Sequence, residues 1–262
     1  MARSRSLVVA AEGDLIVERD RSRASGRLLR QDDMDASYVD LADARHLQFD
    51  YLRWARLVLA GFGARRVLHL GGAACTLARA LLIDDKHSRH EVVEVDERVF
   101  AIARAHLGLR RQPGLKLRVG DGRAVASARP DDSADAIFVD AFVGARVPLH
   151  LATSEAFTEF ARVAPLTLVN VVDTAGWRDA RAIAAGLGDA YAHVAALAAG
   201  NRKGGNLIVF GSRLEPNYTR LETAAKADAS PARLRRAAEL GGAAAWHDGP
   251  PLASGPAATP QP

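Results

Sequence analysis

Residues 67–81 read VLHLGGAACTLARAL and combine the patterns of a strand, a tight turn and a helix. Four mostly apolar residues predict a buried strand, Gly71 and Gly72 predict a tight turn, and the residues from Cys75 onward predict a helix. Nucleotide-binding domains typically begin in this order, because glycines let the backbone approach a ligand and the helix then presents its amides. The GxGxxG spacing of dinucleotide-binding loops is absent, which favours a nucleoside without a pyrophosphate over NAD.

The chain that follows alternates strands with helices. Amphipathic stretches such as DERVFAIARAHL and SEAFTEFARVA predict helices. The apolar runs between them predict strands: EVVEV, LKLRV, DAIFVD and LTLVNVVD, then HVAALAA and NLIVFGS as an antiparallel pair. Near-continuous apolar strands separated by helices indicate a parallel sheet covered on both faces. We therefore predict an α/β fold with a doubly wound, mostly parallel, seven-stranded sheet.

The sequence predicts three parts. Residues 1–50 contain short alternating runs, LVVAA, DLIVERD, GRLLRQ and ASYVDL, which predict a small antiparallel sheet. A helix is expected from Arg45 to Ala60, and the main domain is expected over residues 51–240, with PARLRRAAEL as a helical stretch near its end. The Gly-, Ala- and Pro-rich residues 241–262 predict a disordered tail.

Composition narrows the classes of protein that are possible. The 262 residues are 48% hydrophobic and can bury a full core, and the single cysteine excludes an intramolecular disulfide and a cysteine-based metal cage. The 8 histidines show no ligand spacing, so no metal site is expected. No apolar run has membrane length, and a soluble cytoplasmic protein is expected, with a homodimer possible. The net charge of +4 favours a solvated arginine-rich surface over a nucleic-acid site.

The informative side chains follow the ends of the predicted strands, where open parallel sheets bind their ligands. They are Gly71, Gly72, Glu94, Asp96, Asp121, Gly122 and Asp140. A carboxylate at Glu94 can accept two hydrogen bonds from ribose hydroxyls, and Asp121 can accept one from an exocyclic amine such as that of adenine. Each acidic residue could instead cap a helix. Several at one sheet edge are harder to attribute to capping, and they predict a small-molecule ligand of the nucleoside type.

These segments resemble the spermidine synthase family in order and spacing: VLHLGGAACTLARAL, VVEVDERVFAIARAHL, LRVGDGRAVA, ADAIFVDAF and SEAFTEFARV. That family uses the class I methyltransferase fold to bind S-adenosylmethionine, decarboxylated in the true synthases. The resemblance extends from Gly26 to Ser212. It implies that Glu94 binds the ribose, that Asp121 binds the adenine amine, and that Asp140 stands near the sulfonium as a general base.

Two positions depart from the family's pattern. The aspartate of the family's GGGDGG loop falls on Ala74, and the second aspartate of its D-S-x-D-P loop falls on Val143. The resemblance implies that those carboxylates hold the aminopropyl end of the donor and the ammonium groups of the polyamine. An ammonium buried without a carboxylate costs several kcal/mol, so the sequence predicts little or no spermidine formation. Asp32, Asp33 or Glu155 could compensate from other positions.

Further residues are expected near the substrate. Gln31, Tyr38 and His46 lie where the family's small sheet and first helix fold over the active site. Asp173 ends the fifth strand and could either replace a missing carboxylate or cap the next helix. Tyr51 fits the apolar stripe of its helix and is expected in the core.

The main hypothesis from sequence is a spermidine synthase-like protein that binds S-adenosylmethionine or a related adenosyl ligand, such as the decarboxylated form. It would transfer a methyl or an aminopropyl group from the sulfonium. The alternative is a non-catalytic member of the family that binds a nucleoside or a protein partner. Both hypotheses rest on the same comparison with the family. The chain keeps the residues that bind the nucleoside and lacks the two carboxylates that bind the amine.

Overall fold

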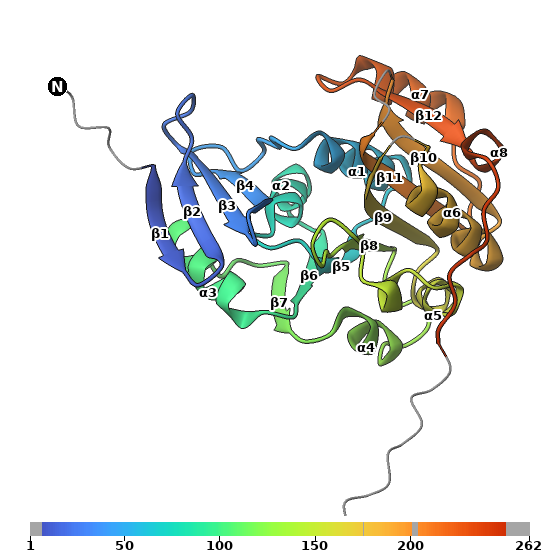
Figure 1. Ribbon diagram of the computed structural model, residues 1–262, viewed down its shortest axis with the longest axis horizontal. Coiled ribbons are helices and arrows are strands. Elements are labelled where there is room, and N and C mark those ends of the chain that lie inside the picture. Colours follow the sequence, from blue (N-terminus) through green and yellow to red (C-terminus); the bar gives the residue numbers. More distant parts are fainter. Residues whose placement is uncertain (1–6, 175, 201–203, 250–262) are drawn as a thin grey trace, which may run out of the picture.

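The computed structural model describes residues 7–174, 176–200 and 204–249, and these form two sheets (Figure 1). A four-stranded antiparallel sheet lies at the left of the view, and an eight-stranded sheet with helices on both faces makes up the rest. The predicted α/β fold and the small N-terminal sheet are therefore confirmed. The large sheet has one strand more than the seven that the sequence predicts.

The N-terminal sheet is an antiparallel meander of β1 (Val8–Glu12), β2 (Leu15–Arg19), β3 (Gly26–Gln31) and β4 (Met34–Asp40). Alternating apolar residues place Leu15, Val17 and Leu29 on one face. These three side chains are fully buried in a cluster with Phe100 of the main domain. The small sheet therefore packs directly on the main domain.

Helix α1 (Asp50–Gly61) joins the two sheets and begins later than the predicted start at Arg45. Asp43 explains the difference, because its carboxylate accepts the Arg45 N–H at 3.0 Å and its carbonyl accepts the His46 N–H at 3.0 Å. Such local side-chain bonds favour a turn over a helix. The later start leaves the residues before Asp50 outside the helix.

Eight strands form the large sheet: β5 (Arg66–Gly71), β6 (Arg89–Glu94), β7 (Leu115–Val119), β8 (Ala136–Asp140), β9 (Leu166–Asp173), β10 (His193–Ala199), β11 (Gly205–Ser212) and β12 (Ala232–Arg236). Their order is β12-β10-β11-β9-β8-β5-β6-β7. The run from β9 to β7 is parallel, whereas β11 pairs antiparallel with β9 and β10, and β12 pairs antiparallel with β10.

The helices that cover this sheet are α2 (Thr76–Asp84), α3 (Glu97–His106), α4 (Gly122–Ser127), η1 (Leu149–Leu151), α5 (Ser154–Val163), α6 (Arg178–Ala190), α7 (Tyr218–Ala227) and α8 (Ala237–Leu240). Phe157 of α5 and Leu187 of α6 pack in one cluster with the sheet. Trp54 of α1, Leu77 of α2 and Leu221 of α7 pack in another. Because both faces are covered, the inner strands β8, β9, β10 and β11 are buried along most of their length, as the sequence runs indicate, whereas edge strand β7 is largely exposed.

The order of the strands reverses at β5. From it the chain proceeds through β6 and β7 in one direction, and through β8 and β9 in the other. Gly71, at the end of β5, lies opposite Asp140, at the end of β8. Open α/β sheets bind ligands in the crevice outside the carboxyl ends of the strands at such a reversal.

The C-terminal part differs from the sequence prediction. In PARLRRAAEL, residues Ala232–Arg236 form edge strand β12, and only Ala237–Leu240 are helical. Pairing with β10 outweighs the helix propensity of these residues, and it buries Ala232. Of the predicted disordered tail, residues 241–249 pack on the domain, because Trp246 joins a hydrophobic cluster and its carbonyl accepts the Ser154 N–H at 2.8 Å. The remaining residues, 250–262, lie outside the described part. No helix in the described ranges is long and apolar enough to span a bilayer.

Candidate active site

A cavity of about 1080 Å³ lies at the point where the strand order reverses. Its walls are the carboxyl ends of β5, β6, β8 and β9, the turn between β3 and β4, and the start of α1. The structure brings together here all seven strand-end residues that the sequence singles out: Gly71, Gly72, Glu94, Asp96, Asp121, Gly122 and Asp140.

Gly71 and Gly72 have different tasks in the turn after β5. Both are left-handed, with φ of 85° and 105°. A Cβ on Gly71 would lie 2.4 Å from the carbonyl oxygen of Asp140, so only glycine fits between β5 and β8. A Cβ on Gly72 would meet nothing within 4 Å, so that residue borders open space. The backbone at Gly72 is therefore accessible to a ligand in the cavity.

Glu94 and Asp96 follow one another at the end of β6 but are held differently. The Oε1 atom of Glu94 accepts the Val95 N–H at 2.9 Å, and burial raises the pKa of this carboxyl. The carboxylate of Asp96 instead caps α3 and binds the Arg98 guanidinium, whose hydrogen bond lowers the Asp96 pKa. Asp96 is thus committed to the helix, and Glu94 is the better candidate for a ligand contact. Between them Val95 is 74% exposed and adds apolar surface to the cavity.

Asp121 is at once a helix cap and part of the cavity wall. Its Oδ1 accepts the Ala124 N–H at 2.8 Å, and its Oδ2 lies 2.8 Å from Nε2 of His150. Burial opposes ionisation of Asp121, but these hydrogen bonds outweigh it and lower the pKa of the carboxyl. Two carboxylate oxygens offer about four acceptor positions, so the cap leaves capacity for a ligand amine. Gly122 is small enough to let α4 approach Leu70, whose Cβ would be 3.2 Å from an added Cβ.

Asp140 lies at the centre of a polar chain beneath the cavity. Its Oδ1 accepts from Nδ2 of Asn170 at 2.8 Å, and the Tyr51 hydroxyl donates to Oδ2 at 3.4 Å. Asn206 in turn donates to Oδ1 of Asn170 at 3.0 Å. Burial raises the pKa of Asp140 to about 6, although the hydrogen bonds from Asn170 and Tyr51 favour the carboxylate. A carboxyl with such a pKa can exchange a proton near neutral pH, which an ordinary aspartate does poorly.

The cavity lining is strongly acidic. In the described part of the chain, the residues that line it include neither Lys nor Arg, and eight of them carry carboxylates: Asp32, Asp33, Asp35, Asp50, Glu94, Asp96, Asp121 and Asp140. Several are paired within the protein, such as Asp96 with Arg98 and Asp35 with Arg30. The imbalance nevertheless favours a ligand with positive charge over one with negative charge.

The two positions that depart from the family's pattern lie in different environments. Ala74 is fully buried in the cluster beneath the N-terminal sheet and does not line this cavity. Val143 lines it and is 76% exposed. Of the carboxylates expected to compensate, Asp32 and Asp33 line the cavity, whereas Glu155 binds His247 and the Asp248 amide elsewhere.

Of the four predicted substrate residues, only Gln31 lines the cavity. The Tyr38 hydroxyl donates to Oδ2 of Asp20 at 2.7 Å, and its ring packs edge-on against His46 with centroids 5.9 Å apart. Neither Tyr38 nor His46 is among the residues that line the cavity. Asp173 accepts the Ala180 N–H at 2.9 Å, so it holds the start of α6.

The cavity lining also includes Asn170, Asn206 and His150, which are not among the residues predicted from the sequence. Tyr51 is predicted in the core, where its ring does pack, but its hydroxyl reaches Asp140. Asn170 carried a signal, since it is the one strongly polar residue inside the apolar run LTLVNVV. His150 lies in the connection after β8, and Asn206 lies in the antiparallel strand β11. Neither residue directly follows the carboxyl end of a parallel strand, so the reasoning from strand ends does not single them out.

Solved structures share this architecture. The chain matches the crystal structure of a probable spermidine synthase from Corynebacterium glutamicum with 30% identity and a TM-score of 0.83, over 95% of this chain and 98% of that one. It also matches a spermidine synthase in complex with the transition-state analogue AdoDATO (15% identity, TM-score 0.61, 81% and 76% coverage). A third match is human methyltransferase-like protein 13 in complex with SAH (18% identity, TM-score 0.53, 67% and 92% coverage). A scan of protein-family models and a search of curated proteins gave no match.

The second and third matches support the fold, and together with the crevice at the strand ends they define a protein of the class I methyltransferase fold. The first match is close and nearly complete in both directions. The chain therefore belongs to the spermidine synthase family, as the resemblance of its motifs indicates.

Proposed function

We propose that the protein binds an adenosyl sulfonium compound in this cavity and transfers an alkyl group from its sulfur to a cationic amine. The observation that carries the proposal is the acidic cavity itself, in which Asp140, with its raised pKa, lies opposite the accessible Gly72 turn. Glu94 would accept hydrogen bonds from the ribose, and Asp121 would accept one from the adenine amine.

The charge of the lining favours the decarboxylated donor. S-Adenosylmethionine carries a carboxylate, whereas its decarboxylated form carries only the sulfonium and an ammonium. No Lys or Arg among the described lining residues is available to bind a donor carboxylate, and the acidic side chains would repel it. Aminopropyl transfer is for this reason the better supported of the two reactions.

The chemical step needs only alignment and a base. The lone pair of the acceptor amine attacks the carbon bonded to the sulfonium. A C–N bond forms as the C–S bond breaks, and its electron pair stays on sulfur to give methylthioadenosine. Only a neutral amine has this lone pair, so the ammonium of the acceptor gives a proton to Asp140 before the attack, and the product nitrogen leaves as a secondary ammonium. Asn170 and Tyr51 orient the Asp140 carboxylate that accepts the proton.

The acceptor amine would be held differently from the family's usual pattern. Position 74 is sealed in the core, and position 143 carries valine, so neither supplies a carboxylate to the cavity. The turn between β3 and β4 offers Asp32 and Asp33 instead, both exposed and both in the lining. This acidic turn supports an amine substrate despite the two missing carboxylates.

Titration calorimetry tests the proposal with three ligands: S-adenosylmethionine, its decarboxylated form and methylthioadenosine. We expect the decarboxylated donor and methylthioadenosine to bind more tightly than S-adenosylmethionine. Glu94→Gln should weaken binding by about 10- to 100-fold, because a hydrogen bond to a charged group contributes about 1.5–3 kcal/mol. Glu97→Gln, at an exposed glutamate three residues along the chain, is the matched control. A folded protein that binds none of the three ligands would sink the proposal.

A non-catalytic nucleoside-binding role is the second candidate, and the absence of carboxylates at positions 74 and 143 favours it. The two roles differ in one outcome. A binding protein would bind methylthioadenosine yet form no product from the decarboxylated donor with any amine, whereas a transferase would release methylthioadenosine during turnover.

A further inference from the structure

The chain after α8 runs down past α6 to α5, and we call residues 241–249 the C-terminal strap (Figure 1). Besides the contact between His247 and Glu155 at 3.1 Å, three hydrogen bonds fix it to the start of α5. The Ser154 N–H donates to the carbonyl of Trp246 at 2.8 Å, the Asp248 N–H donates to Glu155 at 3.0 Å, and the Thr153 hydroxyl donates to Oδ1 of Asp248 at 2.8 Å.

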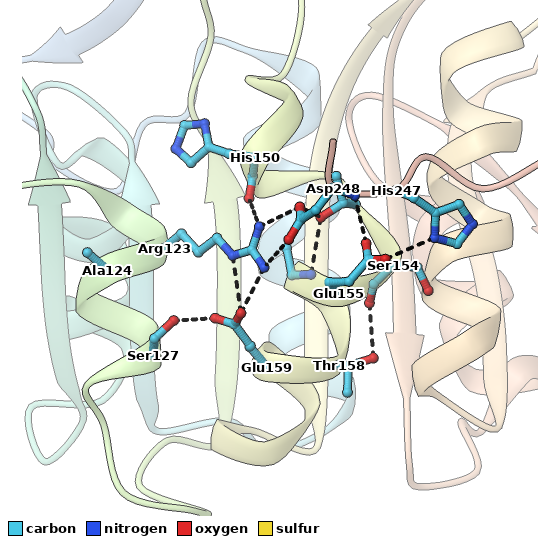
Figure 2. Close-up of polar contacts among 12 residues, drawn as sticks. Arg123, Ala124, Ser127, His150, Ser154, Glu155, Thr158, Glu159, His247 and Asp248 are labelled. Carbon is cyan, nitrogen blue, oxygen red and sulfur yellow. Dashed lines mark hydrogen bonds and ion pairs between the residues drawn. The ribbon is translucent and has the colours of Figure 1, made fainter. Parts of the chain in front are cut away.

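Arg123 is the centre of the contacts that the strap makes (Figure 2). Its guanidinium binds both oxygens of Asp248, at 2.7 and 2.8 Å, and also Oε1 of Glu159 on α5, at 2.8 Å from the nearer nitrogen. The Arg123 side chain is only 17% exposed. Isolated surface ion pairs contribute little, but a bidentate pair within a network fixes the geometry of its members.

The same arginine reaches the cavity wall by two routes. Along the chain, Arg123 follows Asp121 and Gly122, which line the cavity. Through space, its Nη1 donates to the carbonyl of His150 at 3.3 Å, and the imidazole of His150 binds Asp121. Asp248, Arg123, His150 and Asp121 thus form a continuous chain of contacts from the strap to the residue proposed to bind adenine.

Each link constrains the next. Thr153, which accepts the Ala156 N–H as the N-cap of α5 and donates to Asp248, follows His150 by three residues. With Asp248 in place, the segment that carries His150 is held to α4 at one point and to the strap at another. Without Asp248, Glu159 is the one charged partner that Arg123 keeps among the described residues, and the guanidinium that donates to the His150 carbonyl is held less firmly.

We propose that the C-terminal strap positions the adenine-binding wall, with Asp248 acting through Arg123 and His150 on the orientation of Asp121. The inference rests on the proposed function in one respect, namely that adenine binds at Asp121. Asp248 is a positioning residue, because it is not among the residues that line the cavity. Binding is reciprocal in such a coupling, so a ligand at Asp121 should also hold the strap more firmly.

The test compares methylthioadenosine with its 6-deamino analogue, which has hydrogen in place of the amine. Asp248→Asn should reduce the preference for methylthioadenosine over the analogue by about fivefold or more, the lower end of typical coupling between sites. A general loss of stability would weaken both ligands alike and leave the preference unchanged. Asp248→Glu should restore part of it. Asp132→Asn, which breaks the exposed pair with Arg213 at the opposite end of the strands, is the matched control.

A second readout needs no ligand. The 15N resonances of the His150 imidazole, assigned with His150→Gln, report its hydrogen bond to Asp121, and they should shift in Asp248→Asn but not in Asp132→Asn. If the wild-type protein binds methylthioadenosine and Asp248→Asn keeps both the preference and the resonances, the strap has no such role. If the wild-type protein binds neither compound, the proposed function fails, and the resonances alone decide whether the strap positions this wall.

Discussion

Replacing Asp140 with asparagine should stabilise the protein at neutral pH while it removes the transfer activity. The buried carboxyl has a pKa of about 6 where the usual value is 3.8, because ionisation is unfavourable in its surroundings. Asn170 and Tyr51 partly offset this cost through their hydrogen bonds. An asparagine has nearly the same shape, keeps an acceptor for Asn170, and carries no charge.

The size of the effect follows from the two pKa values. They differ by about 2.2, and each pKa unit corresponds to about 1.4 kcal/mol, so ionised Asp140 lowers the free energy of unfolding by about 3 kcal/mol. Because the pKa is raised in the folded state, the protein has its full stability below about pH 3.8, where Asp140 is protonated in both the folded and the unfolded state. This contribution of about 3 kcal/mol is lost as the pH rises through about 6. Asp140→Asn should therefore gain little at pH 4 and up to about 3 kcal/mol at pH 8.

Urea unfolding from pH 4 to 8 measures the gain, with Asp132→Asn as the control for loss of an aspartate at an exposed site. Transfer activity should fall by about 10²- to 10⁴-fold in Asp140→Asn, the usual contribution of a general base. In the wild-type protein the rate should rise with pH through a limb near about pH 6. If the variant's advantage is the same at pH 4 and pH 8, or if it retains full activity, the assignment of Asp140 is wrong.

Two other changes test separate parts of the site. Gly71→Ala should lower the free energy of unfolding by about 2–4 kcal/mol in urea unfolding, because the added Cβ needs a φ of 85° and meets a backbone oxygen at 2.4 Å; a variant of wild-type stability would contradict this account of the turn. Asp32→Asn combined with Asp33→Asn should raise KM for the amine about fivefold with kcat nearly unchanged. These carboxylates would bind the acceptor equally in the ground state and in the transition state, so their loss weakens binding without slowing the chemical step. Steady-state kinetics measures both values, and Glu222→Gln, at a remote site on α7, is the control. An unchanged KM in the double variant would exclude the acidic turn as the amine site.

The sequence indicates which strand-end residues line the cavity because of a general property of parallel sheets. Residues at the carboxyl ends of the strands, such as Gly72, Glu94 and Asp140, lie at one edge of the sheet, and their position there does not depend on the conformation of the connecting loops. The same rule places Asp173 at the ligand edge, because spacing alone does not separate a ligand contact from the hydrogen bond that Asp173 accepts from Ala180 of α6. His150 depends on the path of an irregular loop, which no periodicity encodes.

The C-terminal part was harder to predict for a different reason. Residues 232–236 have no strong strand pattern of their own, and β12 forms because β10 offers an open edge. Residues after Gly241 look like a linker in composition, yet Trp246 and Asp248 find partners on α5 and α4. Both outcomes depend on contacts between segments far apart in the sequence, which local propensity does not report.

The central proposal is that the acid-lined cavity supports alkyl transfer to a cationic amine. The most direct test of it is a transfer assay followed by mass spectrometry. The donors are decarboxylated S-adenosylmethionine labelled in the aminopropyl group and S-adenosylmethionine labelled in the methyl group, each offered with a panel of amines that includes putrescine and with neutral acceptors of similar length. We expect labelled aminopropyl groups on a di- or polyamine, release of methylthioadenosine in equal amount, and no transfer to the neutral acceptors. Label transferred only as methyl, or only to acceptors without positive charge, would contradict the account.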